Sequence, residues 1–331
     1  MLFFNMTMMG TLVSISSFSW FSMWIGLEIN LLSVIPLFKS HKNMMAAEAT
    51  LKYFITQALA SAIILFSIIL TMNMNEFINN NYNYWILMIM NSALLTKMGA
   101  APFHSWFPEV AEGLNWMNNL ILLTWQKLAP MILIMYNLNM TLFFSFIIMI
   151  SAIISGVWGI NQMSLRKILA YSSINHIAWM LASMMNVKMI WFMYFSIYSI
   201  ISMNIILIFY LFNIFYMMQL FNSLNSSKLV KIMFILNFLS LGGLPPFLGF
   251  LPKWLTINFL TMNYFYFLSF ILIVFTLLTL FFYIRIAISS LTIYMNESLA
   301  MKSYIYNTLI LIFNSISIMM LIVCTNMFNI F

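Results

Sequence analysis

The sequence has no aspartate, one cysteine and two arginines in 331 residues, and only 6% of its residues are charged. A soluble domain is usually about 25% charged, so this scarcity of charge excludes water as the main solvent of the chain. Because Cys324 is alone, the sequence excludes an internal disulfide, an iron–sulfur cluster and a thiolate metal site. The formal charge of +7 comes from scattered lysines without a basic run, so we predict no nucleic-acid partner.

Apolar residues take the place of the missing charge, at 64% of the chain with a mean hydropathy of +1.01. The 33 methionines and 33 phenylalanines, with abundant asparagine, are typical of an A/T-rich gene read with an organellar code. The first residues, MLFFNMTMMG, carry neither a positively charged signal region nor an Arg/Ser-rich transit sequence. We therefore expect a membrane protein made inside an organelle.

Long apolar segments predict an all-α polytopic membrane protein, because about 20 apolar residues span a bilayer as a helix. Their connectors are short and polar, and no linker separates domains, so we expect residues 1–331 to form a single transmembrane domain. Eleven helices are predicted, at residues 3–22, 24–38, 49–72, 84–102, 115–136, 140–160, 167–185, 189–216, 230–251, 259–288 and 304–328.

The connectors differ in charge between the two sides of the membrane. Those on the side of the N-terminus hold Lys39, Lys42, Arg166, Lys167, Lys228, Lys231, Arg285 and Lys302, whereas the opposite side holds Lys188. In membrane proteins, the loops on the inner side of the membrane carry an excess of lysine and arginine. The pattern predicts that the N-terminus lies on the inner, matrix side.

Two apolar segments contain residues that interrupt helices. KMGAAPFHSWFPE (97–109) and GGLPPFLGFLPKW (242–254) each have a glycine followed three residues later by Pro-Phe, and each has a lysine close by. Proline removes a backbone donor, and glycine lets the chain leave helical geometry. A matched pair of such breaks in two halves of a chain indicates inverted repeats and a transport site. The alternative is that these glycines and prolines only pack and kink ordinary membrane helices.

Ionisable residues lie inside the apolar segments: Glu28, Lys97, Lys127, Lys253 and the histidine His176. Each charge at the bilayer centre costs about 2.5 to 3.5 kcal/mol, which favours an interior polar path over four unrelated anchors. A carboxylate about 4 Å from a lysine contributes roughly 4 kcal/mol at an effective dielectric near 20, more than the about 2.3 kcal/mol that moves one proton against 100 mV. The alternative is snorkelling to the headgroups, which suits Lys52 and Lys188, is also compatible with Lys253 and fits Lys127 poorly.

Six stretches carry a resemblance to a known family: GLEINLLSVIPL, EATLKYFITQALAS, KMGAAPFHSWFPEVAEGLNWM, LTWQKLAP, LRKILAYSSINHIAWM and LSLGGLPPFLGFLPKW. The chain resembles the antiporter-like proton-pumping subunits of mitochondrial NADH:ubiquinone oxidoreductase (respiratory complex I), and within them the chain 2 family in its insect-like form. The similarity covers residues 10 to 290, and the last stretch is highly specific.

The resemblance implies a mitochondrial inner-membrane subunit that couples NADH oxidation to proton translocation. It places the carboxylate–lysine pair on Glu28 and Lys97, the connecting lysine on Lys127, a polar residue of the central axis on His176 and the terminal residue on Lys253. It also implies other membrane-arm subunits and phospholipids as partners, so the chain is not expected to act as a stand-alone monomer. No cofactor is expected in this chain, since NAD, flavin (FMN), iron–sulfur clusters and ubiquinone belong to partner subunits of that family.

Two other functions are compatible with the residues alone. A self-contained cation/proton antiporter would use the same buried charges without redox partners. A structural membrane subunit would use them only to fix helix register, and apolar replacements would then leave pumping intact.

Overall fold

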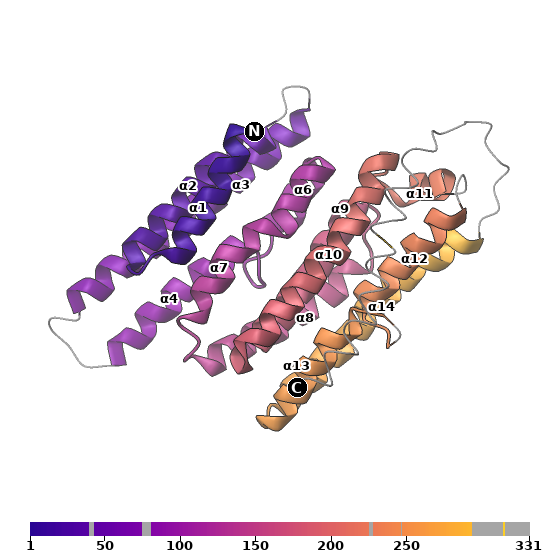
Figure 1. The fold of residues 1–331 in the computed structure, drawn as a ribbon. Coiled ribbons are helices and arrows are strands. Elements are labelled where there is room, and N and C mark those ends of the chain that lie inside the picture. Colours follow the sequence, from indigo (N-terminus) through magenta and orange to yellow (C-terminus); the bar gives the residue numbers. More distant parts are fainter. Residues whose placement is uncertain (40–42, 75–80, 225–227, 246, 293–313, 315–331) are drawn as a thin grey trace. The chain divides into compact units, whose positions relative to one another are not determined.

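The computed structural model describes residues 1–39, 43–74, 81–224, 228–245, 247–292 and 314 (Figure 1). All regular elements in these residues are helices, which confirms the expected all-α class. Five helices in the described part are long and apolar enough to cross a membrane: Trp20–Phe38, Met44–Met72, Thr141–Gly159, Lys188–Phe212 and Tyr266–Ile288. The structure therefore supports a polytopic membrane protein, and the count of eleven spans stays a prediction.

The chain divides into two compact units, Met1–Ser151 and Ala152–Phe331. The first unit contains α1 (Leu2–Ser16), α2 (Trp20–Phe38), α3 (Met44–Met74), α4 (Asn81–Met98), α5 (Trp106–Gly113), α6 (Trp116–Leu123) and α7 (Trp125–Met135). Helix α2 packs between α1 and α3, and α4 packs on both α3 and α7 (Figure 1). Helix α8 (Thr141–Gly159) begins in this unit and ends in the second.

The second unit contains α9 (Leu165–Asn186), α10 (Lys188–Phe212), α11 (Met217–Leu224), α12 (Lys228–Gly242), α13 (Phe250–Met262) and α14 (Tyr266–Thr292). Helix α10 packs on α9, α12 and α13, and α14 packs on α9, α12 and α13. Buried aromatic side chains, among them Phe209, Phe234, Phe238 and Tyr283, join α10, α12 and α14 in the core of this unit.

Several predicted helix boundaries are wrong. The segment predicted as one helix over residues 115–136 is split at Thr124 into α6 and α7. The Thr124 hydroxyl donates to the Leu120 carbonyl at 2.7 Å at this point. Residues expected in connectors form the short helices α5 and α11. Arg285, expected in a connector, lies inside α14. The predicted helix over 304–328 lies outside the described residues, apart from residue 314.

The α1–α2 contact depends on a glycine at its closest approach. A side chain at Gly26 would place its Cβ atom 2.5 Å from the Ser14 amide nitrogen and 2.8 Å from the Ser14 Cα atom. Backbone atoms cannot move aside as a flexible side chain can, so only glycine lets the two helices approach this closely.

We predict that Gly26→Ala destabilises the first unit, because overpacking a tight contact typically costs about 1–3 kcal/mol. The measurement is the melting temperature of the protein in detergent, which should fall. Gly156→Ala is the matched control, since its new methyl group would meet the movable side chain of Phe275 at 3.2 Å. Equal melting temperatures for the two variants would contradict the prediction.

Candidate functional site

The first predicted interruption is present after α4. The chain is non-helical from Gly99 to the start of α5, and Gly99 has a φ of +75°. The Gly99 amide donates to the Thr96 carbonyl at 3.1 Å, and the Ala100 amide donates to the Leu95 carbonyl at 3.1 Å. This glycine-ended pattern satisfies carbonyl groups that a broken helix would otherwise leave without partners.

The second predicted interruption, after α12, has the same geometry. Gly243 has a φ of +79°, and its amide donates to the Ser240 carbonyl at 3.0 Å. The Leu244 amide donates to the Leu239 carbonyl at 3.3 Å, and helix geometry resumes at α13. Each compact unit therefore contains one helix that ends on a left-handed glycine before a short proline-containing segment.

Lys97 and the ammonium group of Lys253 each lie at a helix end that precedes an interruption. Lys97 lies in the last turn of α4 with 7% of its surface exposed. Lys253 lies on α13, yet its Nζ atom donates to the carbonyls of Gly242 at 2.8 Å and Leu241 at 3.4 Å, at the end of α12. The terminal carbonyls and the dipole of a helix stabilise a cation at this end, so the end of α12 stabilises the Lys253 ammonium.

The Lys253 side chain is enclosed by the second interruption and by α9. Only 6% of Lys253 is exposed, and its Nζ atom lies 6.0 Å from the centre of the Trp179 ring. A Cβ atom at Gly243 would lie 2.8 Å from Lys253 Cδ and 2.9 Å from Nζ. Glycine at this position is therefore required both by the backbone conformation and by the space that the ammonium group occupies.

Lys127 lies near a further interruption, between α6 and α7. It is the third residue of α7, 1% exposed, and comes one turn after Thr124. Its Nζ atom lies 5.5 Å from the centre of the Phe107 ring, a cation–π distance. The same ring packs against Gly99, where a Cβ atom would lie 2.8 Å from Phe107. Phe107 thus lies next to both the first interruption and the Lys127 ammonium.

Glu28 is the predicted carboxylate partner of Lys97, and both residues belong to the first unit. It is partly buried on α2. Among the described residues Glu28 and Lys97 form no ion pair within 4.0 Å, so the carboxylate–lysine pair that the resemblance implies is not in direct contact here.

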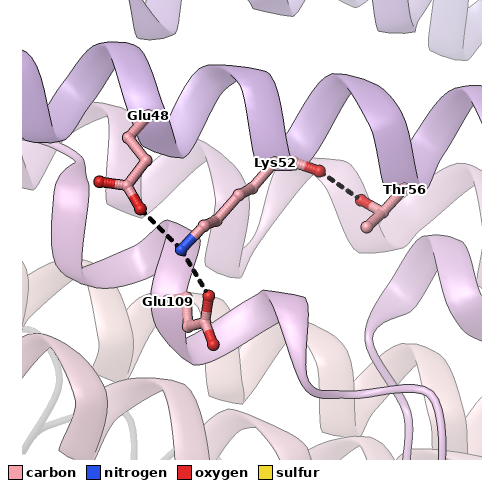
Figure 2. Close-up of polar contacts among 4 residues, drawn as sticks. All are labelled: Glu48, Lys52, Thr56 and Glu109. Carbon is pink, nitrogen blue, oxygen red and sulfur yellow. Dashed lines mark hydrogen bonds and ion pairs between the residues drawn. The ribbon is translucent and has the colours of Figure 1, made fainter.

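Lys52 joins α3 to α5, the helix that follows the first interruption. Figure 2 shows its ammonium between two carboxylates, with Nζ 2.8 Å from Glu48 Oε1 and 2.7 Å from Glu109 Oε2. All three side chains are well exposed, with 42% of the Lys52 side chain accessible. Lys52 and Lys188 are exposed, in agreement with their interpretation as side chains that reach the surface, whereas Lys97, Lys127 and Lys253 are buried.

His176, on α9, is buried in the second unit. Its Nδ1 atom lies 2.9 Å from the Tyr194 hydroxyl, and its ring lies 4.9 Å from the Tyr198 ring. A cavity of about 10 Å³, room for roughly one water molecule, is lined by His176, Tyr194, Ile197, Tyr198, Ile201, Ser240, Leu241, Gly249 and Pro252. The cavity therefore extends from His176 to the α12 end whose carbonyls hold Lys253.

The sequence reasoning missed the two tyrosines beside His176. Their spacing of four residues places Tyr194 and Tyr198 on one face of α10. The sequence shows this spacing, but it does not show that His176 of α9 packs against the same face. In the structure, Glu28, Lys97 and Lys127 belong to the first unit, whereas His176 and Lys253 belong to the second.

Buried lysines at interrupted membrane helices are typical of ion-translocating membrane proteins. Similar proteins of known family belong to the same class. The family model described as "NADH:quinone oxidoreductase/Mrp antiporter, TM" matches residues 17–279. A solved chain of respiratory complex I from Thermus thermophilus with bound aureothin superposes with a TM-score of 0.87 at 19% identity, covering 97% of this chain and 77% of that one. This likeness concerns the fold.

Two mosquito proteins are much closer in sequence, and both are named NADH-ubiquinone oxidoreductase chain 2. The Aedes aegypti protein is 53% identical over 98% of this chain and 96% of its own length. The Anopheles gambiae protein is 49% identical over 96% of this chain and 94% of its own length. The chain belongs to the NADH-ubiquinone oxidoreductase chain 2 family, within the larger family of quinone oxidoreductase and antiporter membrane subunits.

We predict that Gly243→Ala displaces Lys253 from the end of α12. A left-handed conformation costs a residue with a Cβ atom about 1–2 kcal/mol, and here the methyl group would also overlap the lysine side chain. The measurement is the amount and thermal stability of the assembled complex that contains the variant, both of which should fall. Gly242→Ala, whose Cβ atom would lie 3.5 Å from its nearest neighbour, should assemble normally. Loss of assembly in both variants would contradict the prediction.

Proposed function

We propose that this chain is a core membrane subunit of respiratory complex I in the mitochondrial inner membrane. In this function NADH oxidation and ubiquinone reduction occur in partner subunits, and the chain contributes proton translocation across the membrane. The single observation that carries the proposal is the burial of Lys97 and Lys253 at two glycine-ended helix interruptions of the same geometry. The close relatives named NADH-ubiquinone oxidoreductase chain 2 support the choice of complex.

Five residues carry the proposed proton translocation: Glu28, Lys97, Lys127, His176 and Lys253. The Glu28 charge tunes the proton affinity of Lys97, which belongs to the same unit. Lys127 relays the proton, and His176 provides a polar group beside a cavity large enough for one water. Lys253 accepts or releases the proton, and the carbonyls of Leu241 and Gly242 hold its charged form.

The remaining parts of the proposal concern the setting of the chain. Residues 1–331 act as one transmembrane antiporter-like domain, with the N-terminus on the matrix side, as the excess of lysine and arginine in the loops on that side indicates. The chain works only with other membrane-arm subunits and phospholipids, and NAD, FMN, iron–sulfur clusters and ubiquinone are bound by partner subunits. The interrupted helices belong to inverted-repeat-like halves, which the common geometry of the two breaks supports.

The test replaces each buried lysine in the intact complex: Lys97→Met, Lys127→Met and Lys253→Met. A positioned proton-transfer group contributes about 10²–10⁴-fold to its step, so we expect proton pumping and quinone reduction to fall together in an assembled complex. NADH oxidation by an artificial acceptor should stay normal, since it needs only the redox subunits. Lys188→Met is the matched control, because Lys188 is exposed at the start of α10.

Full pumping by all three lysine variants would overturn the proposal and favour a structural subunit. A self-contained cation/proton antiporter predicts a different result, namely proton exchange by the chain alone in liposomes under an imposed sodium or pH gradient. We expect no exchange by the isolated chain and full pumping only when the redox subunits are present.

A further inference from the structure

A pair of buried amides joins α2 to α7 in the first unit. Asn30 Nδ2 donates to Gln126 Oε1 at 2.9 Å, and Gln126 Nε2 donates back to Asn30 Oδ1 at 3.1 Å. The side chains are only 5% and 8% exposed. Two reciprocal hydrogen bonds between planar amides are satisfied in one relative orientation, unlike a single bond that can swivel.

The amide pair lies next to the ionisable residues along both helices. Gln126 directly precedes Lys127, and Asn30 follows Glu28 by two residues. Successive residues of an α-helix point about 100° apart, so fixing the direction of one side chain fixes the directions of its neighbours. Rotation of α7 about its axis would turn Lys127 away from Phe107, and rotation of α2 would turn Glu28 relative to Lys97. The pair opposes both rotations.

Further neutral hydrogen bonds extend this constraint to the first interruption. The Tyr53 hydroxyl on α3 donates to Gln126 Oε1 at 3.4 Å, and the Tyr53 ring packs edge-on against Trp106 of α5. Trp106 Nε1 donates to the Thr96 carbonyl at 3.2 Å.

A direct hydrogen bond from α3 to α4 reaches the backbone of a proposed proton carrier. Gln57 Nε2 donates to the backbone carbonyl of Lys97 at 3.3 Å. The amide pair, Tyr53, Gln57 and Trp106 therefore link α2, α3, α4, α5 and α7 through groups whose charge does not change when a proton passes.

We propose that Asn30 and Gln126 are positioning residues for proton translocation, which set the orientation of Glu28 and Lys127 without carrying a proton themselves. The inference rests on the proposed function of Glu28, Lys97 and Lys127. It differs from a purely structural role, in which buried amides only hold membrane helices together. In the positioning role, the directional bonds are needed for pumping even where the packing is restored by apolar side chains.

The experiment compares three kinds of variant in the intact complex, with the rate of NADH-driven proton pumping per assembled complex as the measurement. Asn30→Leu and Gln126→Met each leave one buried amide without its reciprocal partner. Asn30→Leu combined with Gln126→Met replaces the pair by apolar side chains of similar size, which restores packing without directional bonds. Asn30→Gln combined with Gln126→Asn exchanges the two side chains and keeps both amides.

We expect the two single variants and the apolar double variant to pump protons about fivefold more slowly per assembled complex, because the loss of one hydrogen bond shifts the population of the correct orientation by about that factor. The exchanged double variant should recover pumping to within about twofold, since it can again form both bonds. Asn91→Leu is the matched control, because it removes a fully buried amide of α4 that bonds the Asn137 carbonyl. The control should pump normally.

Two outcomes would overturn the inference. Native pumping by the apolar double variant, or its failure to assemble while the exchanged variant pumps normally, would assign the pair a structural role alone. Lys127→Met separates the two proposals: loss of pumping in Lys127→Met with normal pumping in all amide variants refutes positioning only. Normal pumping in Lys127→Met refutes the role of that lysine in the proposed path itself.

Discussion

The structure depends on one constraint, which is that backbone amides and carbonyls inside a bilayer must find their partners within the protein. A helix that stops in the apolar layer exposes carbonyl groups at its end, and each unsatisfied group is costly. The same two hydrogen bonds meet this constraint at Gly99 and Gly243. The glycine amide donates to the carbonyl three residues earlier, and the following amide donates to the carbonyl five residues before it. Glycine permits both bonds because it adopts a positive φ. The breaks are therefore stable features of the fold.

The same helix ends explain where the buried charges lie. The free carbonyls at the end of α12 hold the Lys253 ammonium, and Lys97 occupies the last turn of α4. Helix-end electrostatics contributes up to about 2 kcal/mol in partly buried sites, and inserting a charged residue costs about 2.5 to 3.5 kcal/mol. The two terms are of similar size, so the end of α12 offsets much of the cost of inserting the Lys253 ammonium.

The sequence was sufficient for the helical class, for both interruptions and for the burial of three lysines, because these depend on local composition and on Gly and Pro at fixed spacing. It was insufficient where a contact joins distant residues. The bond from Lys253 to Gly242 spans the whole second interruption, and the Asn30–Gln126 pair joins positions 96 residues apart. The break at Thr124 was also missed, since threonine inside an apolar run does not usually interrupt a helix.

The most direct measurement is a high-resolution electron cryo-microscopy map of the intact complex in lipid. The account predicts density for Lys253 Nζ at the Gly242 carbonyl, Lys97 and Lys127 inside the protein, and ordered water next to both proline-containing segments. A map in which these lysines extend to the lipid headgroups, or in which both segments are continuous helix with dry surroundings, would contradict it.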